Sequence, residues 1–266
     1  MRTIRRWIRY QYAEHRIAER RNIIRSQLAD VLEGQIQFQL SGNRGQDSIY
    51  IVYCDDVPKA VLRLANPHRK EKKMDMAMPY IPLPAAKRLL QEWHAYEQGA
   101  DKGLTPHPLW RCNDAIVCKF LPYSRLHSEL LESPNNFWQL IVLASQRLSE
   151  LHKIGLVHMD ASLANILTDP SKDHLVFVDF EYGPNMILNT GQQRAYDYLR
   201  LLESSMKYIP PGKNTEHEVW LDLLASLLDQ ETKQADLLPL LPALPRLQAD
   251  SCLWLAVQLI FPAAKL

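Results

Sequence analysis

The stretch HMDASLANIL (158–167), followed closely by HLVFVDFEYG (174–183), decides how this sequence is interpreted. Asp160 and Asn165 lie five positions apart, and Asp179 follows Asn165 by fourteen. The second stretch is rich in β-branched and aromatic residues, which predicts a strand whose last residue is Asp179. A short hairpin would then bring Asp179 beside Asn165.

These three polar residues suit phosphoryl transfer. That reaction needs a carboxylate near the acceptor hydroxyl, and oxygen ligands for Mg²⁺ on the nucleotide phosphates. In the predicted loop, Asp160 is placed to face the acceptor and Asn165 to face the metal. Asp and Asn are also common in turns, so the interpretation depends on the three residues together. For His158 we expect a structural role, with hydrogen bonds that shape the loop.

Both stretches resemble the catalytic loop and the metal-binding loop of the protein-kinase-like superfamily. The D-F-E ending is more similar to aminoglycoside, choline and sugar kinases than to eukaryotic protein kinases. Bacterial kinases that phosphorylate lipopolysaccharide core sugars are also similar, because they combine these loops with a basic N-terminal extension. The resemblance extends from about residue 35 to about residue 205 and is strongest in 151–183.

The resemblance implies a role for each residue of the two loops. Asp160 would orient or deprotonate the acceptor hydroxyl, and Asn165 and Asp179 would hold Mg²⁺ on the phosphates of ATP. Glu181 replaces the usual glycine and could either touch a second metal ion or cap a backbone turn. Asp197, in RAYDYLRLLESS, would brace the catalytic loop.

The N-terminal half predicts an antiparallel sheet that covers the nucleotide. The segments QIQFQL, SIYIVYC and KAVLRLA have the pattern of three consecutive strands. The resemblance places Arg63, in AVLRL, where a lysine usually contacts the phosphates, with Lys59 as an alternative. Glu92 in the next helix would pair with Arg63, and Glu97 is the weaker candidate. Residues 66–79 are charged and unpatterned, which predicts a flexible loop.

Two further segments have expected contacts with ATP. Gly42 and Gly45 in the turn SGNRGQDS would let the backbone approach the phosphates. The segment AIVCKFLP resembles the hinge that joins the two lobes, where backbone groups from Lys119 to Leu121 would form hydrogen bonds with the adenine. This segment could equally be an ordinary buried strand.

The first 34 residues predict a basic amphipathic helix. Residues 1–33 contain no Gly or Pro and have apolar residues at helical spacing, and Gly34 is expected to stop the helix. The first 25 residues carry eight arginines, against Glu14 and Glu19. Such a helix could pack on the protein with a solvated basic face, or it could lie on an anionic membrane surface.

Composition narrows the class of protein. The 266 residues are 47% hydrophobic and 23% charged, with a net charge of +1, which is typical of a globular protein. The four cysteines form no C-x-x-C pair, which suggests reduced thiols in a cytoplasmic protein. No apolar stretch approaches the roughly 20 residues of a membrane span. The basic residues accompany no recognisable nucleic-acid module, so no nucleic-acid partner is expected.

The predicted fold class is α+β, a two-lobed protein-kinase-like fold with a basic N-terminal helix (1–34). An antiparallel-sheet N-lobe (35–122) would precede a mainly helical C-lobe (123–266) that carries the catalytic and metal loops. The expected function is Mg²⁺-dependent transfer of the γ-phosphoryl group of ATP to a hydroxyl of a sugar or small molecule. The preferred acceptor is a lipopolysaccharide core sugar. The protein would meet it at the cytoplasmic face of the inner membrane, which residues 1–25 would contact. A protein Ser/Thr kinase and a pseudokinase scaffold are the alternatives.

Overall fold

The computed structural model describes residues 2–41, 45–70, 73–210 and 217–264. The chain divides into two compact units. We call the first the sheet unit, which comprises Met1–Lys73, Pro84–Ala100 and Pro106–Leu121. The second, the helical unit, comprises Met74–Leu83, Asp101–Thr105 and Pro122–Leu266. Two short segments of the N-terminal half, at 74–83 and 101–105, therefore belong to the helical unit.

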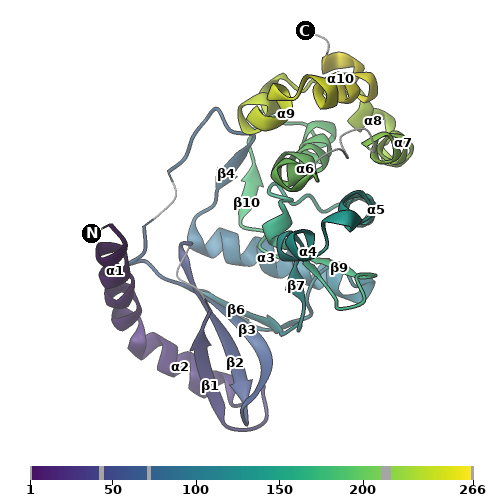
Figure 1. Ribbon diagram of the computed structural model, residues 1–266. Helices are drawn as coiled ribbons and strands as arrows, with labels where there is room; N and C mark the ends of the chain where they lie inside the picture. Colours follow the sequence, from purple (N-terminus) through teal and green to yellow (C-terminus); the bar gives the residue numbers. More distant parts are fainter. Residues whose placement is uncertain (1, 42–44, 71–72, 211–216, 265–266) are drawn as a thin grey trace. The chain divides into compact units, whose positions relative to one another are not determined.

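The sheet unit is built on a five-stranded antiparallel sheet (Figure 1). The strand order is β1-β2-β3-β6-β5, and each neighbouring pair is antiparallel. Alternate residues of β2 (Tyr50, Val52 and Cys54) are buried in the core, as the period of two requires. The three-strand meander predicted from the sequence is present as β1, β2 and β3, and the segment AIVCKFLP contains the buried strand β6. The strands span Ile36–Leu40 (β1), Asp47–Cys54 (β2), Val57–Ala65 (β3), Pro108–Cys112 (β5) and Ala115–Lys119 (β6).

The N-terminal segment is two helices, so the prediction of a single helix was wrong. Helix α1 spans Arg2–Arg16 and α2 spans Ala18–Leu28. Ile24 and Leu28 enter the core of the sheet unit, and the helix ends at Leu28, before β1 begins at Ile36 and pairs with β2. Gly34 is therefore no helix stop; it has φ +102°, and it lies so close to Asp55 that a Cβ would clash with Oδ2 of that side chain.

Helix α3 (Ala85–Gly99) packs on β5 and β6 of the same unit. It buries Leu89, Trp93 and Tyr96, which recur at intervals of three and four residues and so share one face. The short 3₁₀-helix η1 (Ala100–Lys102) follows it.

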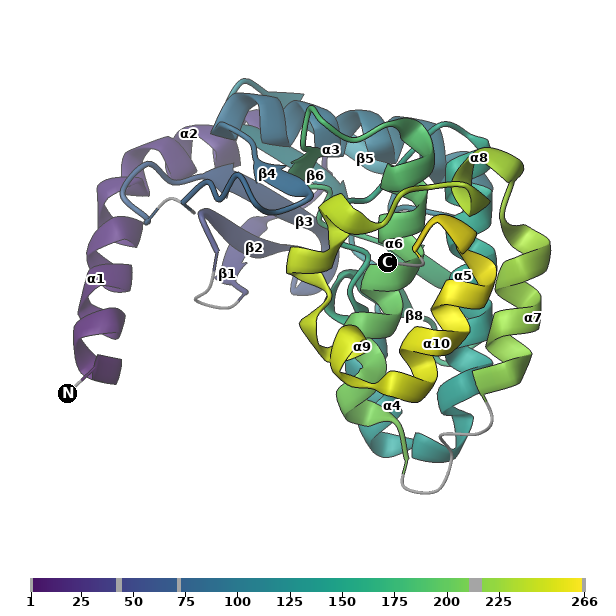
Figure 2. The same ribbon diagram turned by 90° about the horizontal axis from the view of Figure 1, so that it is seen from above.

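Helices make up most of the helical unit, where α5, α6 and α7 lie side by side (Figure 2). The α-helices span Leu126–Glu132 (α4), Phe137–Lys153 (α5), Thr190–Ser205 (α6), His217–Leu227 (α7), Gln230–Lys233 (α8), Pro245–Ala249 (α9) and Ser251–Ile260 (α10). The 3₁₀-helices span Pro134–Asn136 (η2), Leu163–Asn165 (η3), Met206–Tyr208 (η4), Leu238–Ala243 (η6) and Pro262–Ala264 (η7).

Two small sheets frame the predicted loops of the helical unit. Strands β7 (Ser124–Arg125), β8 (Ile166–Thr168) and β9 (Leu175–Phe177) form one sheet. Strand β4 (Tyr80–Pro82) pairs antiparallel with β10 (Tyr182–Pro184) in the other. The strand expected to end at Asp179 ends at Phe177. The Asn185 side chain donates hydrogen bonds to the carbonyls of Met76 and Met78, so the end of the segment predicted as a flexible loop is anchored.

The α+β class, with an antiparallel-sheet part and a mainly helical part, is confirmed. The elements follow one another as a meander, a helix, two more strands, and then helices interrupted by a loop and a hairpin. No helix in the described ranges combines the length and apolar character needed to cross a membrane.

Candidate active site

The buried carboxylate of Asp197 on α6 holds the loop that follows α5. Its Oδ2 accepts hydrogen bonds from the backbone N–H of His158 at 2.8 Å and contacts Nε2 of His152 at 3.0 Å. Its Oδ1 accepts from the backbone N–H of Met159, also at 2.8 Å. Asp197 is fully buried, and Met159 has a left-handed backbone (φ +61°). The carboxylate thus fixes a loop conformation that few residues adopt unaided.

His158 ties this loop to the segment that contains Asp179. Its Nε2 lies 3.0 Å from the carbonyl oxygen of Val178, and its Nδ1 accepts from the backbone N–H of Asp160 at 3.3 Å. These two bonds are compatible with a neutral ring protonated on Nε2. The ring also stacks on Phe180, with a centroid distance of 4.4 Å. The geometry is that of the structural role expected for His158.

Asp160 lies between two partners that hold its carboxylate. The Nδ2 group of Asn165 donates to the Asp160 backbone oxygen at 3.0 Å and to Oδ2 at 3.1 Å. Nε of Arg200, on α6, donates to Oδ1 at 2.9 Å. Because Asn165 uses its nitrogen for Asp160, its Oδ1 is the atom left for a cation. The structure thus brings Asp160 and Asn165 together as the sequence predicts.

Neighbouring groups change the pKa of the Asp160 carboxyl in opposite directions. Burial raises the pKa of the Asp160 carboxyl, the Arg200 guanidinium lowers it, and the negative charge of Asp179 raises it, with a net increase. Arg200 was missed by sequence reasoning. The available signal was its position three residues after Asp197, since residues three apart share a helix face.

Asp179 lies just beyond β9, beside Asn165. The backbone N–H of Val178 donates to the Asn165 carbonyl at 2.9 Å, which extends the β8–β9 pairing by one step. Asp179 itself has φ +70°, a left-handed conformation that is uncommon for a residue with a Cβ. Strain of this kind clusters at functional sites. Glu181, two residues on, is buried.

Asn165 and Asp179 fit a Mg²⁺ ion held mainly by a nucleotide. Within the described ranges, no three His, Cys, Asp or Glu side chains are grouped as a metal site. A Mg²⁺ ion bound to phosphates needs only one or two protein oxygens besides the phosphates and water. The amide oxygen of Asn165 and the carboxylate of Asp179 are ligands of that type.

The sheet unit contains the ion pair predicted around Arg63. Arg63, on β3, pairs with Glu92 on α3 through Nη1, and its Nε donates to Asp47 Oδ2 at 2.8 Å. The alternatives lie elsewhere: Glu97 pairs with His94 on the exposed side of α3. Lys59 is exposed. Asp47 was missed by sequence reasoning.

The remaining predicted contacts with the nucleotide involve two glycines and the hinge segment. Gly42 lies outside the described residues. Gly45 has φ +95°, and a Cβ there would meet no atom within 4 Å. The backbone N–H of Lys119 donates to the carbonyl of His107 at 2.8 Å, so it is not available to adenine as expected. Leu121 follows the last residue of β6 by two positions.

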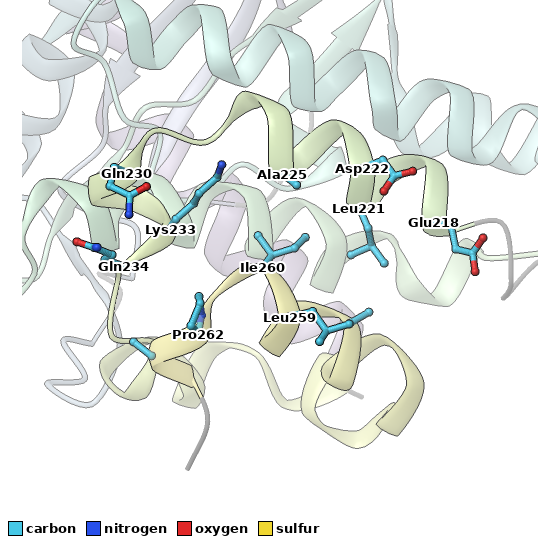
Figure 3. Close-up of a pocket in the computed structure, with 12 residues that line it drawn as sticks. Glu218, Leu221, Asp222, Ala225, Gln230, Lys233, Gln234, Leu259, Ile260 and Pro262 are labelled. Atoms are coloured by element: carbon cyan, nitrogen blue, oxygen red, sulfur yellow. The ribbon is translucent and has the colours of Figure 1, made fainter.

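A separate groove of about 740 Å³ lies on the helical unit (Figure 3). Its centre is apolar, with Leu221, Leu259 and Ile260, while Glu218 and Asp222 lie toward one end. None of the residues predicted for the site lines it. The assignment of the active site therefore depends on the two loops and not on this groove.

The structure thus places Asp160, Asn165 and Asp179 on two adjacent loops of the helical unit, as the resemblance noted in the sequence predicts. No family model matches the chain. Among solved structures, the kinase domain of PknI from Mycobacterium tuberculosis is similar, with a TM-score of 0.44 and 13% sequence identity. The match covers 65% of this chain and 78% of that one. A likeness this distant carries no functional argument, so the case for function depends on the site itself.

Proposed function

We propose that this protein is a phosphotransferase that moves the γ-phosphoryl group of ATP to a hydroxyl of a sugar or small molecule. The observation that carries the proposal is the geometry of Asp160, whose carboxylate is hydrogen-bonded to Asn165 and paired with Arg200. The same loop is joined through the Val178–Asn165 bond to the segment bearing Asp179. A carboxylate beside an amide oxygen and a second carboxylate is the set that phosphoryl transfer requires.

In this mechanism Asp160 accepts the proton of the acceptor hydroxyl as its oxygen attacks the γ-phosphorus and the bond to ADP breaks. Arg200 lowers the pKa of Asp160 and so offsets part of the increase caused by burial, and Asn165 fixes the orientation of the carboxylate. Bound Mg²⁺ would neutralise phosphate charge, with Asn165 and Asp179 as its protein ligands. Arg63 would contact the phosphates. Catalysis of this kind depends on positioning and electrostatic stabilisation.

The segment after Asp179 favours a small acceptor over a protein. Strand β10 begins at Tyr182 and α6 already begins at Thr190. The short connection is held by the pairing of β10 with β4 and by the hydrogen bonds of Asn185. A long activation segment that could present a substrate peptide has no room there, and no A-P-E follows Asp179. A lipopolysaccharide core sugar is the acceptor that we place first, by resemblance.

The test is Mg²⁺-dependent ATP binding and turnover by the wild type, Asp179→Asn and Asp160→Asn. The acceptors are lipopolysaccharide core oligosaccharide, choline, aminoglycosides and a generic protein. We expect Asp179→Asn to lose Mg²⁺-dependent binding and both variants to lose turnover. Asp101→Asn, at an exposed position, is the matched control. Transfer to protein alone would favour a Ser/Thr kinase, and wild type without Mg²⁺-dependent binding would favour the pseudokinase.

We also propose that α1 contacts an anionic membrane surface. Trp7, Ile8 and Tyr12 are each more than half exposed, although they are large and apolar. Arg9 and Arg16 are exposed on the same helix. Apolar side chains beside arginines suit an interfacial helix, and each basic residue near such a surface contributes about 1 kcal/mol.

Substitution tests this contact better than deletion of the N-terminus. Deletion of residues 1–25 would remove Ile24 from the core, so a loss of binding could reflect unfolding. The double variant Ile8→Glu, Tyr12→Glu leaves the core intact and should reduce flotation with phosphatidylglycerol vesicles. Val57→Glu, also at an exposed apolar position, is the control. Equal flotation of the double variant and wild type would contradict the proposed contact.

A further inference from the structure

Arg63 belongs to a buried cluster of four charged side chains in the sheet unit. Asp47 lies at its centre and is 2% exposed. Its Oδ2 accepts from Nε of Arg63 at 2.8 Å and from Nε of Arg88 at 3.1 Å, and its Oδ1 accepts from Nη2 of Arg88 at 2.5 Å. Glu92 pairs with Arg63 and also accepts from the hydroxyl of Tyr96 at 2.5 Å. Asp47 thus holds two arginines at once.

Regular secondary structure brings these residues together. Ile49 on β2 lies opposite Arg63 on β3, so Asp47, two residues before Ile49, is the diagonal neighbour of Arg63 on the same face. Long side chains reach across such a diagonal. Arg88 and Glu92 are four residues apart on α3 and share one face of the helix. The cluster therefore joins one sheet face to one helix face.

The charges of this cluster cancel, with two arginines against Asp47 and Glu92. Buried charges are tolerated when they are paired and hydrogen-bonded. The guanidinium of Arg63 presents Nε to Asp47 and Nη1 to Glu92, so its plane is fixed by two carboxylates. Lysine has a methylene where arginine has Nε, and its single ammonium group cannot reproduce this fork.

We propose that Asp47 is a positioning residue for nucleotide phosphate binding, because it orients Arg63 and makes position 63 specific for arginine. This inference depends on the proposed function, in which Arg63 contacts the phosphates of ATP. The backbone of Asp47 is held in turn by Arg69, whose Nη1 donates to the Asp47 carbonyl at 2.5 Å. Nη2 of Arg69 pairs with Glu14 of α1 at 2.8 Å, which also links Asp47 to the N-terminal helix.

The experiment is a double-mutant cycle on Mg²⁺–ATP affinity, measured by titration calorimetry. The variants are Asp47→Asn, Arg63→Lys and the two combined. We expect each single variant to weaken binding about tenfold, the scale of one hydrogen bond between charged groups. In the Arg63→Lys background, Asp47→Asn should change affinity less than about twofold, because Asp47 acts through the Arg63 guanidinium. Glu97→Gln, on the exposed side of α3, should leave affinity unchanged.

A second readout needs no nucleotide. In ¹⁵N NMR spectra, the Nε–H of Arg63, assigned through its loss in Arg63→Lys, should be protected from solvent exchange in wild type and exchange rapidly in Asp47→Asn. Additive effects in the cycle, or an unchanged Nε–H signal in Asp47→Asn, would overturn the proposal.

Arg63→Lys keeps the inference testable if Asp47→Asn does not fold. Lysine at 63 with wild-type affinity would refute the requirement for arginine, and tenfold weaker binding would support it. Wild type that fails to bind Mg²⁺–ATP would overturn the proposed function itself, together with this role. Failure of the proposed function can therefore be distinguished from failure of the proposed role of Asp47, because it appears in the wild type without any substitution.

Discussion

Arg200→Gln tests how Arg200 affects the ionisation of Asp160, the carboxylate that we propose acts on the acceptor hydroxyl. The substitution removes the cation whose Nε lies 2.9 Å from Asp160 Oδ1. Burial raises the pKa of Asp160 and Arg200 lowers it, so its removal should raise this pKa further and reduce the ionised fraction at a given pH. An opposite charge at such a distance typically changes a pKa by about 1–3 units. The acid limb of the pH–rate profile should therefore move to higher pH by about one unit or more.

The loss of rate at neutral pH follows from the lost hydrogen bond. Hydrogen bonds between charged groups contribute about 1.5–3 kcal/mol, and about 1.4 kcal/mol corresponds to a tenfold change in rate. We therefore expect kcat to fall about 10- to 100-fold, with little change in the KM for ATP. The assay is steady-state turnover from pH 5 to 9 with the acceptor identified as above.

Arg194→Gln is the matched control for this prediction. Arg194 lies on the same helix, and its pair with Asp229 (2.5 Å) lies outside the Asp160–Asn165–Arg200 hydrogen-bond group. Arg200→Lys should keep the acid limb closer to that of wild type, because it retains the charge, but should still lower kcat. The reasoning is refuted if Arg200→Gln changes neither kcat nor the acid limb while the wild type is active.

Three further predictions concern stability. Asp197→Asn should lower the free energy of unfolding, measured by urea denaturation, by about 3 kcal/mol, because an amide cannot accept all the hydrogen bonds that this carboxylate accepts. Unchanged stability would contradict the role of Asp197 in holding the loop. Gly191→Ala should cost about 1–3 kcal/mol in thermal unfolding, since its Cβ would lie 2.6 Å from the Glu231 carbonyl, and a neutral effect would show that this contact relaxes freely. For Glu14, burial raises the pKa but hydrogen bonds to buried donors outweigh it, so the folded-state pKa lies below the unfolded one. The stability that ionised Glu14 contributes is thus fully present above its unfolded-state pKa and is lost as pH falls through its folded-state pKa. The stability of Glu14→Gln should therefore depend less on pH below about pH 5. Equal pH dependence of the variant and wild type would contradict this prediction.

Local pattern was sufficient for much of the fold and for the core of the candidate site. The meander follows from alternation of period two, and its strands appear where that pattern lies. Asp160 and Asn165 share one loop, so their proximity is set by a few intervening residues. The pairing of Arg63 with Glu92 was also predicted, from a resemblance that covers both elements.

The missed features depend on contacts between distant segments. The break between α1 and α2, near Ile17, accompanies the packing of Ile24 against the sheet, which helical spacing alone does not reveal. The pairing of β4 with β10 joins residues about a hundred positions apart, and each strand is too short to have a clear pattern. Asp179 lies beyond its strand because the chain turns there into a left-handed conformation.

By itself, the sequence determined the α+β class of fold and the types of side chain at the candidate site. Both follow from the spacing of residues along the chain. Only the tertiary structure decided which charged groups accompany those residues. Arg200 reaches Asp160 from α6, and Asp47 reaches Arg63 across a strand diagonal. In both cases the partner is selected by the direction in which a helix or strand presents its side chain, and no spacing in the sequence specifies which distant element will pack there.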